Sequence, residues 1–184
     1  MKFLLKLKHW QLFILLVGLP FIVQMVMVAV MMITKNMYVA FIAFPLMMIF
    51  MLVFFFGWFY ALGTNLHKKL PENLHMNVSR FKTFLFVPVG YIILIFLFVL
   101  IMIALSPREP NPAVFLVMVP LHLFSMFCVF YSMYFVSKTL RTVELQRELI
   151  FSDHAGEFFL IWFFPIGIWF IQPRINKIFE NELI

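Results

Sequence analysis

The chain has 184 residues, of which 65% are hydrophobic and only 12% are charged, and its mean hydropathy is +1.04. Soluble globular proteins are about half apolar and about a quarter charged, so this composition excludes a soluble protein and indicates an integral membrane protein. The net charge of +6 does not indicate a nucleic-acid ligand, because the basic residues flank apolar segments, where anionic lipid headgroups attract them.

Four windows without charged residues are each longer than the ~20 residues that a helix needs to cross ~30 Å of hydrocarbon. Apolar residues occupy successive positions in these windows rather than alternate ones, which excludes a transmembrane β-barrel. The sequence therefore predicts an all-α, polytopic helical membrane protein that forms one membrane domain over residues 1–184. The four transmembrane helices are predicted over about 11–33, 38–62, 81–105 and 112–137.

Polar side chains are scarce within these windows. Gln24 lies near the middle of the first, and His122, Ser125 and Ser132 share one stripe of the fourth because they are three and seven residues apart. This stripe must face other helices. One interpretation is packing, in which neutral His122 donates a hydrogen bond worth about 0.6 kcal/mol to another helix. The other is a polar path or binding site near mid-bilayer, formed by all four residues.

Lysine and arginine residues are concentrated in alternate connections between the helices. Only Lys35 and Arg108 lie in the other connections. Because basic residues are retained on the cytoplasmic side, this asymmetry predicts a cytoplasmic N-terminus and short outer loops at 34–37 and 106–111. The cytoplasmic set is Lys2, Lys6, Lys8, Lys68, Lys69, Arg80, Lys82, Lys138, Arg141 and Arg147.

A cytoplasmic helix over about 138–150 is expected to continue the fourth transmembrane helix. Arg141 and Glu144, and Glu144 and Arg147, are three residues apart and can form ion pairs on one helix face. One interpretation is a solvated, charge-balanced face. The alternative is a docking surface for a partner protein, with Arg141, Arg147 and the later Arg174 as its contact residues.

The sequence SDHAGE places Asp153, His154 and Glu157 close together. Two carboxylates and a histidine are metal ligands, but His154 points away from the face that the two acids share, so these residues are weak candidates. The favoured interpretation is the start of a helix, with Ser152 as N-cap and acidic side chains in the first turn. No metal site is therefore predicted.

The segment FFLIWFFPIGIWFIQ, residues 158–172, is apolar but short. As a single helix it covers about 21 Å, less than the ~30 Å of hydrocarbon. The FPIG sequence suits a turn, with Pro165 and Gly167 at the tip of a re-entrant hairpin that returns Arg174 to the cytoplasm. A tilted short fifth span, with Pro165 and Gly167 forming a kink, is the close alternative, and a helix lying flat on the membrane is disfavoured because the segment has no polar face.

The stretch SDHAGEFFLIWFFPIGIWFIQPRINKIF resembles the C-terminal signature of small, uncharacterised multi-spanning inner-membrane proteins of Bacteroidetes-type bacteria. The resemblance covers about residues 138–179. It implies a bacterial inner-membrane location and supplies no catalytic residues.

The sequence contains no nucleophile elbow, no phosphate-binding glycine loop and no HExxH motif, so nothing nominates an enzyme and no cofactor is expected. The favoured hypothesis is a non-enzymatic inner-membrane subunit, an accessory or scaffold of a larger membrane complex. Its expected partners are membrane lipids, other membrane subunits or further copies of itself. The alternative is a small homo-oligomeric channel or carrier with a polar path near His122. A membrane enzyme that acts on lipid is the third hypothesis.

Overall fold

The computed structural model describes residues 2–36, 38–105 and 113–180. Within these residues the regular structure is entirely helical, and four helices are long and apolar enough to cross a membrane, which confirms the predicted class. The elements in chain order are α1 (Phe3–Lys6), α2 (His9–Phe13), η1 (Ile14–Gly18), α3 (Leu19–Thr34), α4 (Tyr38–His67), α5 (Val78–Leu105), α6 (Ala113–Leu145), α7 (Phe151–Trp162) and α8 (Phe164–Phe179).

The first rod, one of the four candidate membrane spans, consists of α2, η1 and α3, which follow one another without a break over His9–Thr34. Its middle element, η1, is a π-helical turn. Pro20 has no N–H group to donate to the carbonyl of Leu16, and its ring crowds the preceding turn. The helix changes to the wider π geometry just before this proline, where the N–H of Leu19 donates to the carbonyl of Ile14, five residues earlier.

Helices α4, α5 and α6 each contain one internal proline and remain helical throughout. Helix α6 extends beyond the predicted transmembrane limit of residue 137 and ends at Leu145. The next residue, Gln146, has a φ of 53°, a left-handed conformation that cannot continue the helix. The predicted cytoplasmic helix over 138–150 is therefore too long, because only its first half continues α6 and residues 146–150 form a loop.

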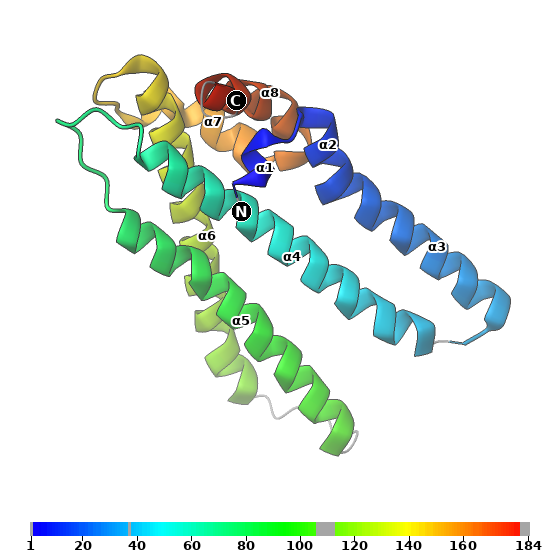
Figure 1. Cartoon of the computed structure of the whole chain (residues 1–184). Coiled ribbons are helices and arrows are strands. Elements are labelled where there is room, and N and C mark those ends of the chain that lie inside the picture. Colours follow the sequence, from blue (N-terminus) through cyan, green and yellow to red (C-terminus); the bar gives the residue numbers. More distant parts are fainter. Residues whose placement is uncertain (1, 37, 106–112, 181–184) are drawn as a thin grey trace.

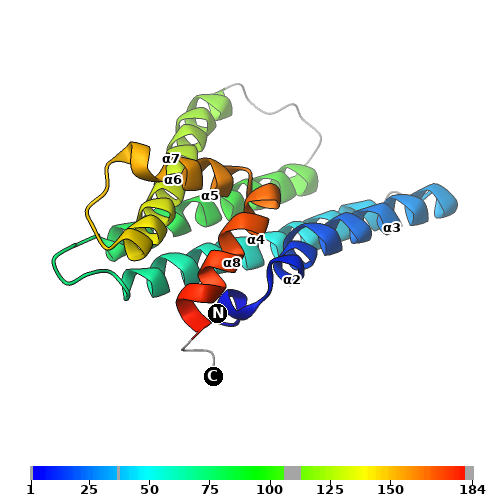
Figure 2. The same ribbon diagram turned by 90° about the horizontal axis from the view of Figure 1, so that it is seen from above.

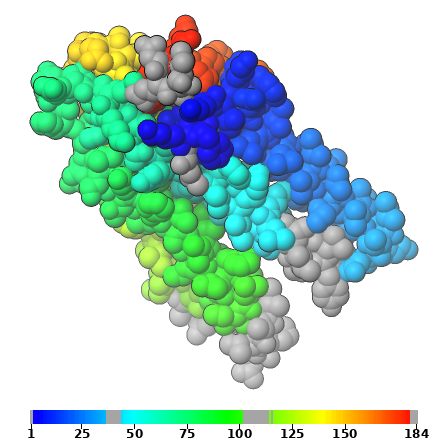
Figure 3. Space-filling view, viewed as in Figure 1, coloured from blue at the N-terminus to red at the C-terminus, as the bar shows by residue number. Residues whose placement is uncertain are grey.

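The long helices form two pairs, α3 with α4 and α5 with α6 (Figure 1). Both pairs start from a common end, where α1, α7 and α8 lie, and they diverge away from it in both ribbon views (Figures 1 and 2). The space-filling view also shows the far parts of α4 (cyan) and α5 (green) standing apart (Figure 3). The buried core therefore lies at the common end, and its largest side chains include Trp58, Phe59, Phe81, Phe135 and Leu140.

Helices α7 and α8 meet at Phe163, where the chain leaves the helical conformation with φ −89° and ψ 53°. The turn predicted at Pro165 and Gly167 is misplaced, because both residues lie in the first turns of α8. Proline is well tolerated at such a position because its missing N–H would have no helical partner there. With 12 and 16 residues, each helix is shorter than the ~20 residues of a perpendicular span.

Candidate functional site

Four charged side chains from three helices meet at the common end. This ion-pair cluster consists of Arg141 and Glu144 on α6, Glu157 on α7 and Arg174 on α8. Arg174 donates from Nε to Glu144 Oε1 at 2.7 Å, and its terminal nitrogen donates both to Glu144 Oε2 and to Glu157 Oε1, the latter at 2.9 Å. The planar guanidinium thus joins the last helix to both preceding ones.

Arg141 completes the cluster from the other side. Its terminal nitrogen donates to Glu144 Oε2 at 3.3 Å, and its Nε lies 3.7 Å from Glu157 Oε1. The hydrogen bond with Glu144 raises the pKa of Arg174 above its ordinary value. Burial lowers this pKa, but the hydrogen bond with Glu157 raises it as well. Arg174 is therefore permanently charged and firmly paired.

The three arginines proposed as docking residues contact acids of their own chain. Arg141 and Arg174 belong to the ion-pair cluster, and Arg147 lies 3.3 Å from Asp153 Oδ1. Arg147 does not pair with Glu144 as the i, i+3 spacing suggested, because α6 ends before it. In this arrangement each of the three charges has an acidic partner within the chain.

A second cluster of polar side chains forms hydrogen bonds with the backbone of the N-terminal segment, residues 4–7. This amide cluster consists of Trp58 on α4 and Gln172 and Asn176 on α8. The buried Gln172 accepts a hydrogen bond from Trp58 Nε1 at 3.1 Å and donates to the carbonyls of Leu4 and Leu7 at 3.1 and 2.8 Å. Asn176 donates to the carbonyl of Leu5 at 2.8 Å. The carbonyls at the end of α1 lack helical partners, and the two amides satisfy them.

Substitution of Gln172 by leucine tests this attachment. We expect a loss of about 3 kcal/mol in the free energy of unfolding, because the indole N–H and the buried carbonyl of Leu4 would lose their partner and the carbonyl of Leu7 would keep only Asn176. We also expect residues 2–8 to exchange amide hydrogens faster. Trp58→Phe removes only one of these bonds and should cost about 1 kcal/mol. Equal stability of Gln172→Leu and the unsubstituted protein, measured by SDS titration in mixed micelles, would contradict the assignment.

His154 lies on α7, three residues before Glu157, and is fully buried. Its Nδ1 lies 3.0 Å from Ser137 Oγ, its ring makes edge contacts with Tyr134 and Phe151, and its Nε2 has no hydrogen-bond partner among the described residues. Burial lowers the pKa of His154, and the charge of Lys138 acts in the same direction against the opposing influence of the nearby acids. The ring is therefore held neutral.

A stability change with pH follows from this histidine. The unfolded chain takes up a proton near pH 6.5, whereas the folded chain does so only at lower pH. The contribution to stability is complete above about pH 6.5 and declines as the pH falls through the lowered folded-state pKa. We expect His154→Asn, which keeps a polar atom near Ser137, to lose less stability than the unsubstituted protein between about pH 7 and about pH 5. Parallel stability curves would refute this.

The three weak metal candidates have other partners. Asp153 contacts Arg147, His154 contacts Ser137, and Glu157 contacts both arginines of the ion-pair cluster. Among the described residues, no group of three or more His, Cys, Asp and Glu side chains could hold a metal ion. The predicted N-cap, Ser152, lies instead within α7, and the first turn is closed by Asp153, whose carboxylate accepts the backbone N–H of Ile150 at 3.2 Å.

The four intramembrane polar residues are not gathered into one site within the described chain. Ser125 and Ser132 are buried on α6, and Ser132 donates to the carbonyl of Cys128 one turn earlier at 2.9 Å. His122 lies on an exposed part of α6 beside the ring of Tyr91. Gln24 lies on α3, which pairs with α4 rather than with α6.

Gln172, Asn176, Trp58 and Ser137 were not singled out from the sequence. The available signal was the presence of a lone amide, Gln172, at the end of an apolar segment, since a buried amide requires a hydrogen-bond partner. Its partners lie more than 100 residues away along the chain, so they were not predictable from local patterns.

Comparison with protein-family models, with curated proteins and with solved structures gives no significant match for this chain.

Proposed function

We propose that this protein is a non-enzymatic integral subunit of a bacterial inner membrane, an accessory or scaffold that associates with other membrane proteins or with further copies of itself. The observation that carries the proposal is the contrast between the two ends of the molecule. At the common end, the side chains of the ion-pair cluster and the amide cluster are paired within the chain itself. Along the membrane windows of the first rod and of α5, only 11% of the residues are buried.

Exposed apolar faces of this kind are covered either by lipid or by the helices of a partner. Helix association in a bilayer depends on close packing and not on the hydrophobic effect, so a subunit needs a defined helix arrangement to present a matching surface. The ion-pair and amide clusters join α1, α4, α6, α7 and α8 and thereby hold the two helix pairs in a fixed relation. This is the property expected of a scaffold.

The proposed orientation places the common end in the cytoplasm. The lysine-rich N-terminal segment, the loop at 68–77 and α8 all lie there, in agreement with the retention of basic residues on that side (Figure 1). With Cys128→Ser as background, a single cysteine at the exposed Lys177 should be labelled only from the cytoplasmic side. Labelling from the outside alone would reverse the orientation.

We further propose that the turn between α7 and α8 enters the cytoplasmic leaflet as a shallow re-entrant pair. The side chains around this turn are large, apolar and exposed: Phe159, Trp162, Phe163, Ile166, Trp169 and Phe170. Trp residues favour the boundary between headgroups and hydrocarbon. The polar side chains of the pair, Glu157, Gln172 and Arg174, contact protein instead.

Photo-crosslinking in native membranes tests the subunit hypothesis. We would place benzoylphenylalanine at Phe21 on α3, Phe96 on α5 and Phe127 on α6, which are all exposed, and at the buried Phe81 as the control. We expect at least one exposed position to give a protein adduct of discrete mass, either twice that of the chain or that of a heteromeric pair, and the control to give none. Lipid adducts alone at every exposed position would refute the proposal.

The channel hypothesis has less support from the geometry, because Gln24 and His122 lie on different helix pairs. Flux through reconstituted protein that changes on His122→Ala would restore it. Unchanged or undetectable flux agrees with the subunit proposal.

A further inference from the structure

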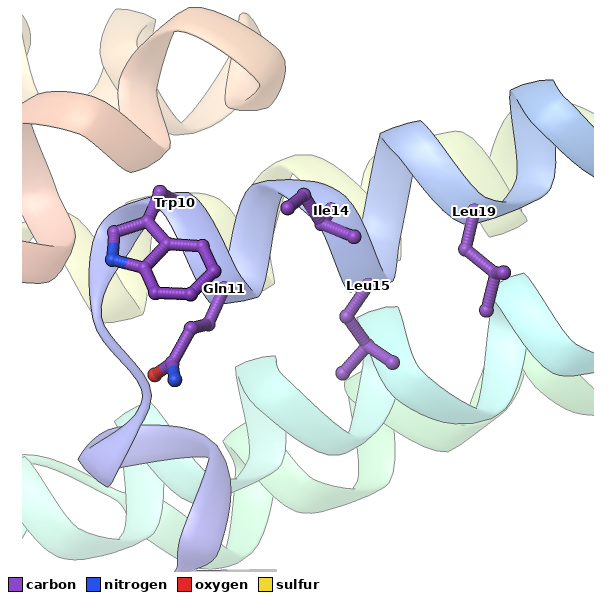
Figure 4. A pocket seen from close by; sticks show the side chains of 5 residues that line it. All are labelled: Trp10, Gln11, Ile14, Leu15 and Leu19. Atoms are coloured by element: carbon purple, nitrogen blue, oxygen red, sulfur yellow. The ribbon is translucent and has the colours of Figure 1, made fainter.

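A shallow furrow lies along the first rod, and only its deeper part is also lined by α4. It consists of two open hollows of about 260 and 270 Å³ that meet at Leu19, which lines both. The hollow nearer the common end is lined by Trp10, Gln11, Ile14, Leu15 and Leu19 (Figure 4). The deeper one is lined by Leu19, Pro20, Val23 and Met27 of α3 and by Leu46, Met47 and Phe50 of α4.

The π-helical turn Ile14–Gly18 lies beside the point where the hollows meet. A π-turn shifts the side chains that follow it around the helix axis, and such turns occur frequently at functional sites. Figure 4 shows Leu15 and Leu19 directed from the rod toward α4, and Trp10 and Gln11 at its beginning. The furrow therefore lies where the rod departs from regular α-helical geometry, directly before Pro20.

The two ends of the furrow differ in chemistry. At the common end, Gln11 Oε1 accepts a hydrogen bond from the backbone N–H of Lys8 at 2.9 Å. The amide N–H groups of Gln11 and the indole N–H of Trp10 are hydrogen-bond donors at the same hollow. Lys6 and Lys8, directly before the rod, are exposed and form no ion pair within the described residues. The deeper hollow is lined by apolar side chains alone. The furrow thus has polar side chains at its mouth, with two exposed lysines directly before it in the chain, and is apolar along its length.

We propose that this furrow binds one anionic phospholipid, with the phosphate near Lys6, Lys8 and Gln11 and an acyl chain along the α3–α4 seam. From Trp10 to Met27 the rod advances about 25 Å at 1.5 Å per residue, close to the thickness of one leaflet with its headgroups, about 20–22 Å. A helix, about 10–12 Å wide with its side chains, does not fit into hollows of this volume, whereas a methylene chain does. Met27 and Met47 have flexible side chains that adapt to such a chain.

Lipid binding to the purified full-length protein is the direct test. We would titrate dioleoyl phosphatidylglycerol or dioleoyl phosphatidylcholine, which share their acyl chains, and count bound lipids by native mass spectrometry. We expect one phosphatidylglycerol to remain bound under conditions that remove phosphatidylcholine. Phosphatidylglycerol with brominated acyl chains should quench the fluorescence of Trp10, measured as the difference between the unsubstituted protein and Trp10→Phe.

Two variants test the contribution of basic charge at the mouth of the furrow and the contribution of the hollow itself. Lys8→Gln should weaken binding of phosphatidylglycerol about fivefold, the factor that corresponds to about 1 kcal/mol for one basic residue near an anionic surface. Lys68→Gln removes an exposed lysine from the α4–α5 loop and should leave the affinity unchanged. Leu15→Trp fills the first hollow and should reduce retention of the lipid at least tenfold, with its helix content checked by circular dichroism.

Several outcomes would overturn the proposal. Equal retention of the two lipids would remove the anionic specificity, and equal weakening by Lys8→Gln and Lys68→Gln would show nonspecific attraction to basic charge. Undiminished retention by a folded Leu15→Trp would place the lipid elsewhere. If Leu15→Trp fails to fold, the Lys8→Gln comparison and the quenching of Trp10 decide the question.

Discussion

Replacement of Gly167 by alanine is expected to destabilise the packing of α8 on α7 by about 3 kcal/mol or more. A methyl group at Gly167 would overlap the backbone carbonyl of Leu160 on α7. Because backbone atoms cannot move aside by changing a rotamer, the two helices would have to separate. The separation would displace the neighbouring buried residues Ile168 and Ile171. The measurement is the midpoint of unfolding by SDS in mixed micelles.

Gly156 provides a matched control within the same pair of helices. It lies inside α7, and a methyl group there would meet no other atom within 4 Å. Since alanine favours a helix over glycine, Gly156→Ala should stabilise the protein by about 0.5–1 kcal/mol. If both substitutions changed the midpoint in the same direction and to the same extent, the close approach at Gly167 would be wrong.

Replacement of Arg174 by alanine is the second change with a large expected effect. It would leave Glu144 and Glu157, whose side chains are only 21% and 11% exposed, near each other with Arg141 as their single counter-charge. We expect a loss of about 3 kcal/mol in the free energy of unfolding, because removal of one partner leaves a poorly solvated charge uncompensated. Protease sensitivity of residues 151–180 should increase, which is measurable by limited proteolysis followed by mass spectrometry.

Arg147→Ala is the control for this effect. Arg147 is 58% exposed and pairs with Asp153 at the surface, so its removal should cost less than about 1 kcal/mol. Arg174→Lys keeps the charge but cannot hold Glu144 and Glu157 with the same planar geometry, and it should give an intermediate loss. A loss from Arg147→Ala as large as that from Arg174→Ala would mean that the ion-pair cluster has no special role.

Local ion pairs were only partly predictable. The pair between Arg141 and Glu144 follows from their spacing of three residues on one helix and is present at 3.3 Å. Glu157 and Arg174 join it from 13 and 30 residues beyond Glu144, through the folding of α7 and α8 against α6. No periodicity within one helix contains that information.

The turn between α7 and α8 shows the same limit. Pro165 and Gly167 were expected at its tip because both are common in turns. In the structure, proline occupies the helix start, where its missing N–H has no helical partner, and glycine lies where α8 comes close to the backbone of α7. The turn itself is at Phe163, which has no turn preference of its own.

The all-helical membrane class and the four long helices follow from the sequence alone, because the bilayer imposes a length and an apolar composition on each helix separately. Tertiary structure alone decided the ends of α6, α7 and α8, the partners of Gln172 and Arg174, and the furrow beside Pro20. These features depend on contacts between residues far apart in the chain. The carbonyl of Leu4, the guanidinium of Arg174 and the missing side chain of Gly167 each favour one packing of the helices over others that would bury similar apolar surface.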